Sequence, residues 1–579
     1  MKLKNLAFII IVFLYSCDTE ENDLEESINE DSIAFTIAIS NLENKNGVII
    51  TENTVTFTED ITIPEDVVLN FNVRDRMIIN SDVTVTINGI ISAGKFQIFE
   101  IADGGKVNGC PQIEYITPQW WGTDDSGSTP ASDNFQTAIE SFDCIKKFVS
   151  SGKFLVDKEI LLNIDERSYD FTGSHFIGTE IGTLFGAGGL VTIGNRNFNF
   201  DKNYSVENVT VQGGIFEPKY NHDNSLSILN SKNIKISDIT IFGDKGLRGI
   251  ALQTPGENLV NNPIIENIII ENILQEGGVN VINIDLNHGL VKDVIINNVI
   301  GSSINEINPQ NNKREAAFRC SGQISPESNE IRIDGLTIDN VLLDEVYMGF
   351  NLRGIKTSIS NVEIDKVDFR GFNIYGAESL SINNVQIKGS GANFSTTGIY
   401  IDHFEPINGS DINLSKIELT GEFGLGIWNR SKEVSFTNVY ANIKSNNTVI
   451  KNTGDNCVYS SLYIKNNESS PIHAAIFNGF ENNDIPSIGI NANFDGVILG
   501  NFTHGVINQA QNSNFNFQFD GTFNNGAFFT FYNANGYSSV YRANMNLSSN
   551  STPINNYRNG DLYELYVYDP INNIYVLNP

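Results

Sequence analysis

The chain has 579 residues, enough for several ordinary domains or for one long repeat array. Hydrophobic residues make up 40% of it, so apolar side chains for a packed core are available throughout. The formal net charge of -32 argues against nucleic acid as a partner, because phosphate binding needs a basic surface. An acidic polymer could bind only at a local basic patch.

The N-terminus has the pattern of a secretory leader. Met-Lys-Leu-Lys precedes the apolar run 6–15, which is too short to span a bilayer. The run ends in Leu14-Tyr15-Ser16-Cys17, which resembles a bacterial lipobox and implies that residues 1–17 are a lipoprotein signal segment, with Cys17 lipidated and left as the new N-terminus after cleavage. Residues 18–33 are acidic, without bases or aromatics, and are expected to form a disordered tether. This tether resembles the surface-export signal of Bacteroidetes lipoproteins, which implies an outer-membrane protein facing the cell surface.

Residues 34–120 alternate like short strands, for example at 54–58 and 83–88, and are predicted to form an N-terminal β cap. The cysteines after the leader show no metal-type spacing. One disulfide among them is open to the sequence, and buried free thiols are the expected state. These cysteines are Cys110, Cys144, Cys320 and Cys457.

Two tryptophans and a short helix follow the cap. Trp120-Trp121-Gly122 precedes residues 133–142, whose apolar side chains have helical spacing and for which Asp133 is the predicted cap. The segment resembles the entry of the pectate-lyase-like superfamily of right-handed β-helices. The tandem tryptophans are expected to pack the cap against the first coil rather than to bind sugar.

Residues 121–547 carry a recurring phrase, Asn or Asp, then Val or Ile, any residue, and Val or Ile. The intervals of roughly 22 to 30 residues, with a few longer ones, are typical of a solenoid. Because each unit holds an alternating strand, the predicted fold is an all-β parallel β-helix, with residues 548–579 as a C-terminal β cap. The resemblance implies that this β-helix is right-handed and single-stranded. The phrase begins at Asn208, Asp238, Asn267, Asp293, Asn361, Asn384 and Asn438.

A second type of strand aligns across the coils and predicts a wall of outward side chains. Its apolar positions recur every second residue, and the others should stack about 4.8 Å apart from coil to coil. One predicted column is Asn283, Arg319, Asn351, Asn373, Tyr400 and Trp428. The next is Gln253, Asp285, Ser321, Arg353, Tyr375, Asp402 and Arg430, with His288 and His403 in the adjoining turns.

Aromatic rings that stack on sugars beside arginines that bind carboxylates favour an anionic, uronate-containing polysaccharide as the partner. The main hypothesis is a monomeric lyase that cleaves this polymer by β-elimination. The predicted catalytic residues are Arg319, Arg353, Tyr375 and His403. The predicted substrate-binding residues are Asn283, Asn351, Asn373, Tyr400, Trp428, Arg430 and His288. The resemblance also implies that Ca²⁺ could serve instead, with Asp285 and Asp402 as ligands.

Two alternatives remain open. A glycoside hydrolase needs two facing carboxylic acids, for which Asp285 with Asp402 and Glu315 with Asp344 are the candidate pairs. The second pair belongs to a rival cluster in the turns before the wall strands, although the motifs of polygalacturonase-type hydrolases are absent. A non-catalytic, surface-anchored glycan-binding protein is the other alternative. The rival cluster is Glu276, Arg314, Glu315, Asp344, Glu345 and Arg370.

Overall fold

The computed structural model divides into two units, residues 1–242 and 243–579, which are treated separately. Near the N-terminus it describes only the strands β1 (Ile10–Leu14), β2 (Glu25–Glu26) and β3 (Gly47–Thr51), so most of the predicted leader and tether, including Cys17, lies outside the described residues. The other described residues are 54–179, 188–194, 204–219, 224–243, 248–254, 264–286, 289–308, 311–322, 332–391, 395–402, 411–445, 447–479, 490–523, 527–530, 539–547, 552–555, 561–569 and 574–577.

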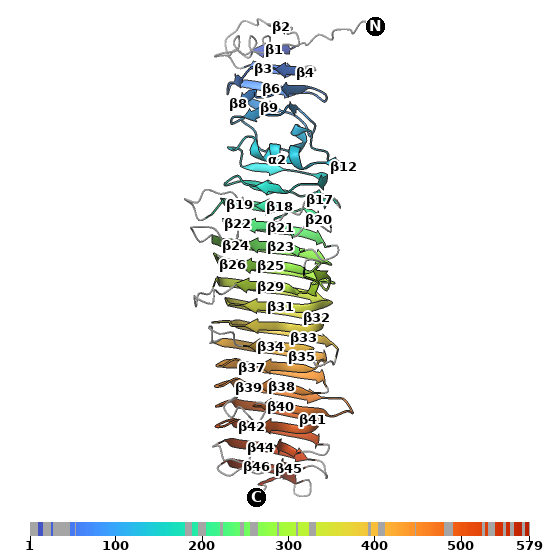
Figure 1. The fold of residues 1–579 in the computed structure, drawn as a ribbon, viewed down its shortest axis with the longest axis vertical. Coiled ribbons are helices and arrows are strands. Elements are labelled where there is room, and N and C mark those ends of the chain that lie inside the picture. Colours follow the sequence, from blue (N-terminus) through green and yellow to red (C-terminus); the bar gives the residue numbers. More distant parts are fainter. Residues whose placement is uncertain are drawn as a thin grey trace. The chain divides into compact units, whose positions relative to one another are not determined.

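The first unit begins with three rows of short parallel strands, which form β3–β6–β9, β4–β7–β10 and β5–β8–β11 (Figure 1). Inward side chains such as Phe57, Met77 and Phe99 are fully buried, which explains the alternation in the sequence. The region predicted as a β cap therefore itself consists of stacked coils of parallel strands. The strands are β4 (Thr54–Phe57), β5 (Ile61–Ile63), β6 (Val67–Phe71), β7 (Arg76–Ile79), β8 (Thr84–Ile87), β9 (Ile90–Ser92), β10 (Phe99–Ile101) and β11 (Lys106–Asn108).

An aromatic plug follows these coils. The 3₁₀-helix η1 (Pro118–Trp121) buries both tryptophans, and the Trp121 ring lies 5.1 Å from that of Phe99. The predicted packing role of this pair is confirmed. The short helix α2 (Ser132–Glu140) exists, but its N-cap is Ala131, so Asp133 is not the cap. Asp133 lies in the first turn and pairs with Lys158 at 2.7 Å.

The expectation of buried free thiols is right for Cys320 and Cys457 and wrong for Cys110 and Cys144. Cys110 and Cys144 form a disulfide that links the segment after β11 to the segment after α2. Cys320 and Cys457 are buried free thiols, and burial raises their pKa to about 12 and about 11. Neither of these thiols is therefore a reactive nucleophile.

The rest of the first unit continues as parallel rows, such as β14–β17–β20 and β15–β18–β21. No helix in the described part of the chain is long and apolar enough to cross a membrane. The strands are β12 (Ser126–Pro130), β13 (Lys147–Val149), β14 (Gly152–Val156), β15 (Ile160–Leu162), β16 (Ser168–Asp170), β17 (Ser174–Gly178), β18 (Gly189–Ile193), β19 (Val206–Gln212), β20 (Ile215–Glu217), β21 (Asn224–Leu229) and β22 (Ser231–Phe242).

The second unit stacks two rows of parallel strands, here called the short row and the long row. The short row is β23 (Arg248–Gln253), β25 (Asn280–Leu286), β29 (Ala316–Gly322), β31 (Val346–Arg353), the end of β32 (Ile355–Tyr375), β34 (Thr397–Asp402), β36 (Leu425–Asn429), β38 (Thr448–Asn452), β40 (Ile472–Asn478), the end of β41 (Asn493–Asn508), β43 (Ala527–Thr530) and β45 (Thr552–Asn555).

The long row takes the first parts of β32 and β41 and otherwise consists of separate strands. These are β24 (Ile264–Glu276), β26 (Leu290–Ser302), β30 (Ile333–Asp344), β33 (Ser381–Ser390), β35 (Ile412–Glu422), β37 (Val434–Lys444), β39 (Val458–Asn466), β42 (Asn514–Phe523), β44 (Val540–Leu547) and β46 (Leu562–Asp569). A small hairpin joins β27 (Ile307–Asn308) to β28 (Lys313–Arg314), and β47 (Ile574–Leu577) pairs antiparallel with β46. The predicted all-β parallel β-helix is confirmed.

The recurring sequence phrase marks a bend inside the strands. Its first residue has a positive φ in all seven copies, for example 55° at Asn267 and 57° at Asn384. Asparagine and aspartate tolerate this left-handed conformation better than other side chains with a Cβ. The Val or Ile that follows is buried in each case. The phrase is therefore a corner residue followed by a core residue.

A ladder of buried asparagines runs through the short row. The side-chain amide of Asn429 donates to Asn452 at 3.0 Å, Asn452 to Asn478 at 2.8 Å, and Asn478 to Asn508 at 2.9 Å. The amide of Asn508 donates to the Tyr541 hydroxyl at 2.6 Å. All four asparagines are fully buried, so each coil depends on the next for hydrogen-bond partners.

Asn452→Ala should lower the free energy of unfolding by about 2 kcal/mol or more, because it removes one hydrogen-bond partner from each of the buried side chains Asn429, Asn478 and Tyr459. Chemical denaturation monitored by circular dichroism measures the change. Asn438→Gly, at an exposed corner with φ 56°, is the control and should change stability little. Equal losses in the two variants would show that the ladder has no special role.

Candidate functional site

The outward side chains of the short row form the predicted wall. Asn283 pairs in register with Arg319, Arg319 with Asn351, Asn351 with Asn373, Asn373 with Tyr400, and Tyr400 with Trp428. The second column runs through Asp285, Ser321, Arg353, Tyr375 and Asp402 in the same coils. The structure therefore reproduces the register of the two predicted columns, but Asn283, Asn373 and Tyr400 are buried in it.

Stacked aromatic rings inside the coils hold the wall strands in place. The ring of Phe318 lies 4.7 Å from that of Phe350, which lies 4.5 Å from that of Phe372. Each ring is followed by a wall residue, so this packing fixes where the wall side chains begin. The structural reason is the alternation of the strand, which sends successive side chains to opposite faces.

The N-terminal end of the wall is an ion-pair cluster. Arg319 contacts the carboxylates of Asp285 at 2.8 Å and Glu315 at 3.3 Å. Burial opposes ionisation of Glu315, but Arg319 and hydrogen bonds from Asn311 and Asn308 outweigh it and hold its pKa below the ordinary value. Two carboxylates already neutralise Arg319, which argues against its predicted role in binding the substrate carboxylate.

Asn283 is also a poor candidate for substrate binding. Its side chain is fully buried, and its amide has no hydrogen-bond partner among the described residues. A polymer on the surface could not reach it in this conformation. Its predicted role as a binding residue is therefore not supported.

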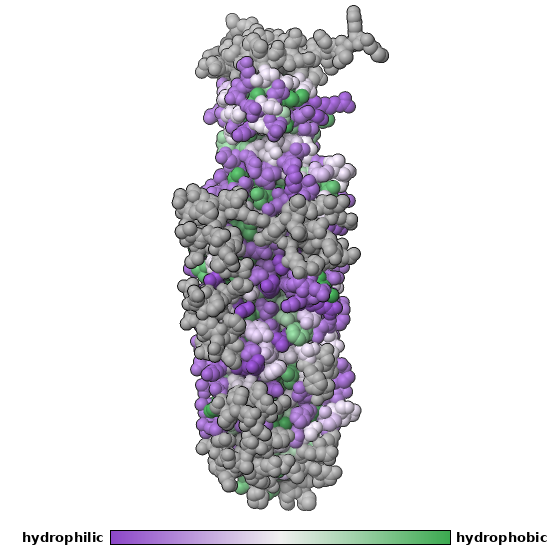
Figure 2. Space-filling model, viewed as in Figure 1, coloured by the Kyte–Doolittle hydropathy of each residue, from purple (hydrophilic) through white to green (hydrophobic). Residues whose placement is uncertain are grey.

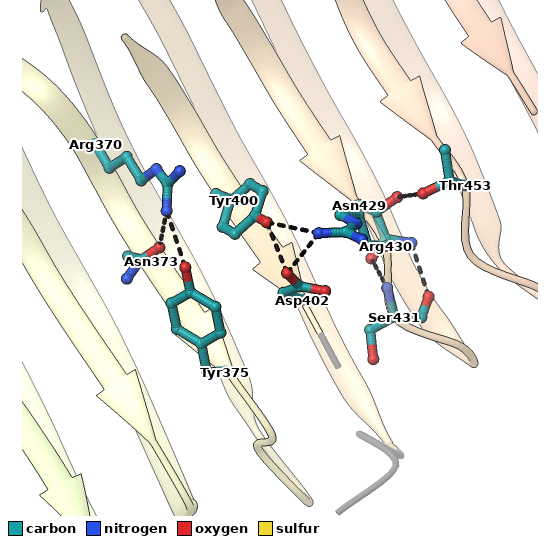
Figure 3. A network of polar contacts seen from close by, with 9 residues as sticks. All are labelled: Arg370, Asn373, Tyr375, Tyr400, Asp402, Asn429, Arg430, Ser431 and Thr453. Carbon is teal, nitrogen blue, oxygen red and sulfur yellow. Dashed lines mark hydrogen bonds and ion pairs between the residues drawn. The ribbon is translucent and has the colours of Figure 1, made fainter. Parts of the chain in front are cut away.

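The centre of the wall holds an arginine with neutral partners (Figure 3). One terminal nitrogen of Arg370 donates to the side-chain oxygen of Asn373 and, at 3.3 Å, to the Tyr375 hydroxyl. The guanidinium carbon lies 3.9 Å from the centroid of the Tyr400 ring, a cation–π contact. No carboxylate pairs with Arg370 in the described part of the chain. This cation is consequently held in place while its charge stays uncompensated.

Tyr400 belongs to a second hydrogen-bonded group, which Figure 3 shows beside Arg370. Its hydroxyl donates to Asp402 at 2.7 Å, and Arg430 donates to Asp402 at 2.8 Å and to the Tyr400 oxygen at 3.2 Å. Burial, together with the bond to Asp402, raises the pKa of Tyr400 to about 12. Tyr400 therefore remains protonated at neutral pH and acts as a hydrogen-bond donor rather than as a base.

The wall continues one coil beyond its predicted end. Lys451 follows Trp428 in register, and its ammonium group lies 5.2 Å from the Trp428 ring. The sequence signal was available, because Ile450-Lys451-Asn452 repeats the pattern of Ile427-Trp428-Asn429. Arg370 was assigned from the sequence to the rival turn cluster, but its side chain contacts the wall residues Asn373 and Tyr375.

The wall from β31 to β38 forms a local basic patch on an acidic protein. The wall residues that the structure describes in this stretch include four cations and one carboxylate, Asp402. Arg353 lies in this stretch, directly beside Tyr375 in register. Such a patch is what an anionic polymer requires on a chain with a net charge of -32. The cations are Arg353, Arg370, Arg430 and Lys451.

The carboxylate pairs proposed for metal binding or hydrolysis are not supported. Four register steps separate Asp285 from Asp402, which amounts to about 19 Å at the spacing of neighbouring strands. This exceeds the span of a single Ca²⁺ site and the roughly 6.5–9.5 Å between the carboxyl groups of inverting glycosidases. Each of the two is also paired with an arginine, as is Glu315. No group of three or more potential metal ligands exists among the described residues.

His288 and His403, predicted for the turns beside the wall, lie outside the described residues. Their roles remain predictions. Asn351 and Asn373 are joined by a 2.9 Å hydrogen bond, so these two predicted binding residues lie together beside Arg370.

No family model matches the sequence, and no curated protein does either. Among solved structures, the pre-mature gene product 12 of bacteriophage phi29 is 14% identical over 80% of this chain and 58% of that one, with a TM-score of 0.44. The surface adhesin PfbA of Streptococcus pneumoniae is 12% identical over 78% of this chain and 100% of that one, with a TM-score of 0.38.

A GH87 α-1,3-glucanase catalytic domain, solved with tetrasaccharides, is 13% identical over 56% of this chain and 65% of that one, with a TM-score of 0.33. This chain thus spans little more than half of the phage protein's length. Likenesses this remote carry no argument about activity, so the function must be argued from the wall itself.

Arg319→Met should lower the free energy of unfolding by about 1–3 kcal/mol, because it leaves the carboxylates of Asp285 and Glu315 without their shared cation. Because the pKa of Glu315 is lower in the folded protein than its ordinary value of 4.5, the ionised Glu315 stabilises the fold above pH 4.5. That contribution is lost as the pH falls through the pKa of the folded state. The difference in free energy of unfolding between the wild type and Arg319→Met should therefore be largest above pH 4.5 and should shrink below that pH. Denaturation curves at several pH values measure it.

Removing the two acids as well is the control for this prediction. The triple variant Arg319→Met, Asp285→Asn, Glu315→Gln should recover most of the lost stability, because no unpaired charge remains. A single variant as stable as wild type would contradict the assignment of Arg319 to a structural ion-pair cluster.

Proposed function

We propose that the wall from β31 to β38 binds an anionic, uronate-containing polysaccharide and cleaves it by β-elimination. The observation that carries this proposal is Arg370, which is held by Asn373, Tyr375 and the Tyr400 ring without a carboxylate partner among the described residues. A guanidinium fixed in this way is prepared for an anion from outside. The Trp428 ring and Lys451, further along the wall, offer an apolar face and a cation to neighbouring sugars.

The proposed chemistry uses three groups in adjacent coils. Arg370 and Arg353 bind the uronate carboxylate and neutralise it, which makes the hydrogen on C5 acidic enough to remove. Tyr375 reacts as the phenolate and takes that proton, the C4–O bond breaks, and a C4–C5 double bond forms. Tyr375 then passes the same proton to the departing oxygen, which returns the residue to the phenolate. Arg370 stabilises charge on the Tyr375 oxygen, to which it already donates a hydrogen bond at 3.3 Å.

Tyr400, Asp402 and Arg430 act as support in this mechanism. Their mutual hydrogen bonds hold the Tyr400 ring against Arg370 and leave none of the three free to serve as a base. This division of roles distinguishes the two wall tyrosines, which the sequence alone placed in the same group.

Elimination is tested by the ultraviolet absorbance of the new conjugated double bond, measured on a panel of acidic polysaccharides with and without EDTA. Tyr375→Phe and Arg370→Met should each lower kcat/KM by about 10²–10⁴-fold, because one removes the proton carrier and the other the charge that stabilises the transition state. Arg542→Met is the matched control, since Arg542 pairs with Glu564 outside the wall and should leave turnover unchanged.

The alternatives give different outcomes in the same assay. New reducing ends without ultraviolet absorbance would mean hydrolysis and would overturn the elimination mechanism. Binding without either product, lost in Arg370→Met, would leave a glycan-binding surface protein. Sensitivity to EDTA would show that a metal contributes.

We also propose that the protein is anchored in the outer membrane by a lipid on Cys17, as its leader pattern predicts. Labelling cells that express the full chain with radioactive palmitate should mark the wild-type protein but not Cys17→Ser. The variant should also leave the membrane fraction. Equal labelling of both would contradict the anchor.

A further inference from the structure

Three neighbouring strands of the long row carry exposed aliphatic side chains. Ile269, Leu274, Ile295, Ile300 and Leu342, here called the aliphatic patch, are each 37–46% exposed. On the face that Figure 2 shows, hydrophilic residues predominate and hydrophobic ones form small separate patches. Exposed aliphatic side chains in three adjacent strands point to a binding surface.

The register shows that the aliphatic patch consists of two short columns, one on each side of the corner residues Asn272 and Asn298. Ile269 lies beside Ile295, and Leu274 lies beside Ile300, which lies beside Leu342. In the following coils the same columns turn polar, with Glu363 and then Gln386 after Leu342. The column of Leu274, Ile300 and Leu342 thus ends at β30 on its C-terminal side.

A hollow of about 400 Å³ lies along one side of the aliphatic patch. Ile300 and Leu342 line it together with corner asparagines such as Asn298 and Asn340. The hollow gives a partner a place to insert apolar side chains, with amide groups beside them for hydrogen bonds.

The strands that carry the aliphatic patch are mainly acidic. The three strands β24, β26 and β30 contain seven acidic residues and one basic residue, Lys292. A second copy of this chain would bring an equally acidic face against the first, so like charges oppose self-association here. The patch contains no aromatic ring to stack on a sugar, which disfavours a glycan.

We infer that the aliphatic patch is a docking surface for a basic, amphipathic segment of another protein. Leucine-like side chains of that segment would cover the column of Leu274, Ile300 and Leu342, while its lysines or arginines would face the acids around them. This surface is separate from the wall, so the inference does not depend on the proposed polysaccharide chemistry.

A fluorescent synthetic peptide of leucines and lysines in helical amphipathic order serves as the probe for the full chain, with binding followed by anisotropy. Two variants test the patch, Ile300→Asp and Leu342→Asp, and each should weaken binding at least about tenfold. Ile307→Asp is the matched control, because Ile307 is 48% exposed but belongs to β27, outside the patch. Glu276→Lys combined with Asp344→Lys should also weaken binding and reduce its dependence on salt.

Peptide order, charge and oligomeric state distinguish the outcomes, and melting curves check that each variant is folded. Binding that is lost when the same residues are scrambled, or when glutamates replace the lysines, supports the proposal. Equal binding of the scrambled peptide, or an equal loss in Ile307→Asp, would overturn it. Sedimentation that shows a wild-type dimer abolished by Ile300→Asp would make a second copy the occupant and would also overturn it.

Discussion

The parallel register between neighbouring coils is the constraint on which the other features of this protein depend. Each residue lies beside its counterpart in the next coil, about 4.8 Å away. A side chain at one position therefore contacts either the same type of side chain or a complementary one in the next coil. Inside the coils this produces stacked rings such as Phe350 on Phe372, which lie 4.5 Å apart. Outside, the same rule places Arg353 beside Tyr375 and Tyr400 beside Trp428.

Charge on the wall is ordered along the same direction. The cluster of Asp285, Glu315 and Arg319 neutralises its own arginine, whereas Arg370 has only neutral partners among the described residues. The difference arises from the residues that register puts beside each arginine, since carboxylates accompany the first and an amide and a phenol accompany the second. An anionic polymer would therefore meet a repulsive end and an attractive centre on the same face.

The fold could be read from the sequence because its signal is periodic. The recurring Asn or Asp phrase reports a backbone bend that few other residues adopt, and the alternating apolar positions report the core. The columns of the wall followed from the same alternation. What the sequence could not give was the direction of each long side chain: Arg370 precedes its strand segment in the manner of a turn residue but reaches Asn373 and Tyr375. The disulfide between Cys110 and Cys144 also escaped, because spacing alone does not pair cysteines.

The two asparagine ladders of the second unit have opposite senses. In the buried ladder each amide donates toward the following coil, from Asn429 to Asn452 and onward to Tyr541. At the exposed corners the donation runs the other way, from Asn298 to Asn272 and from Asn384 to Asn361. Within each ladder the amide dipoles align head to tail and reinforce one another, as peptide dipoles do in a helix. The two asparagine ladders point in opposite directions. A coil added to the stack would therefore extend both ladders and contribute amide dipoles that oppose each other along the axis.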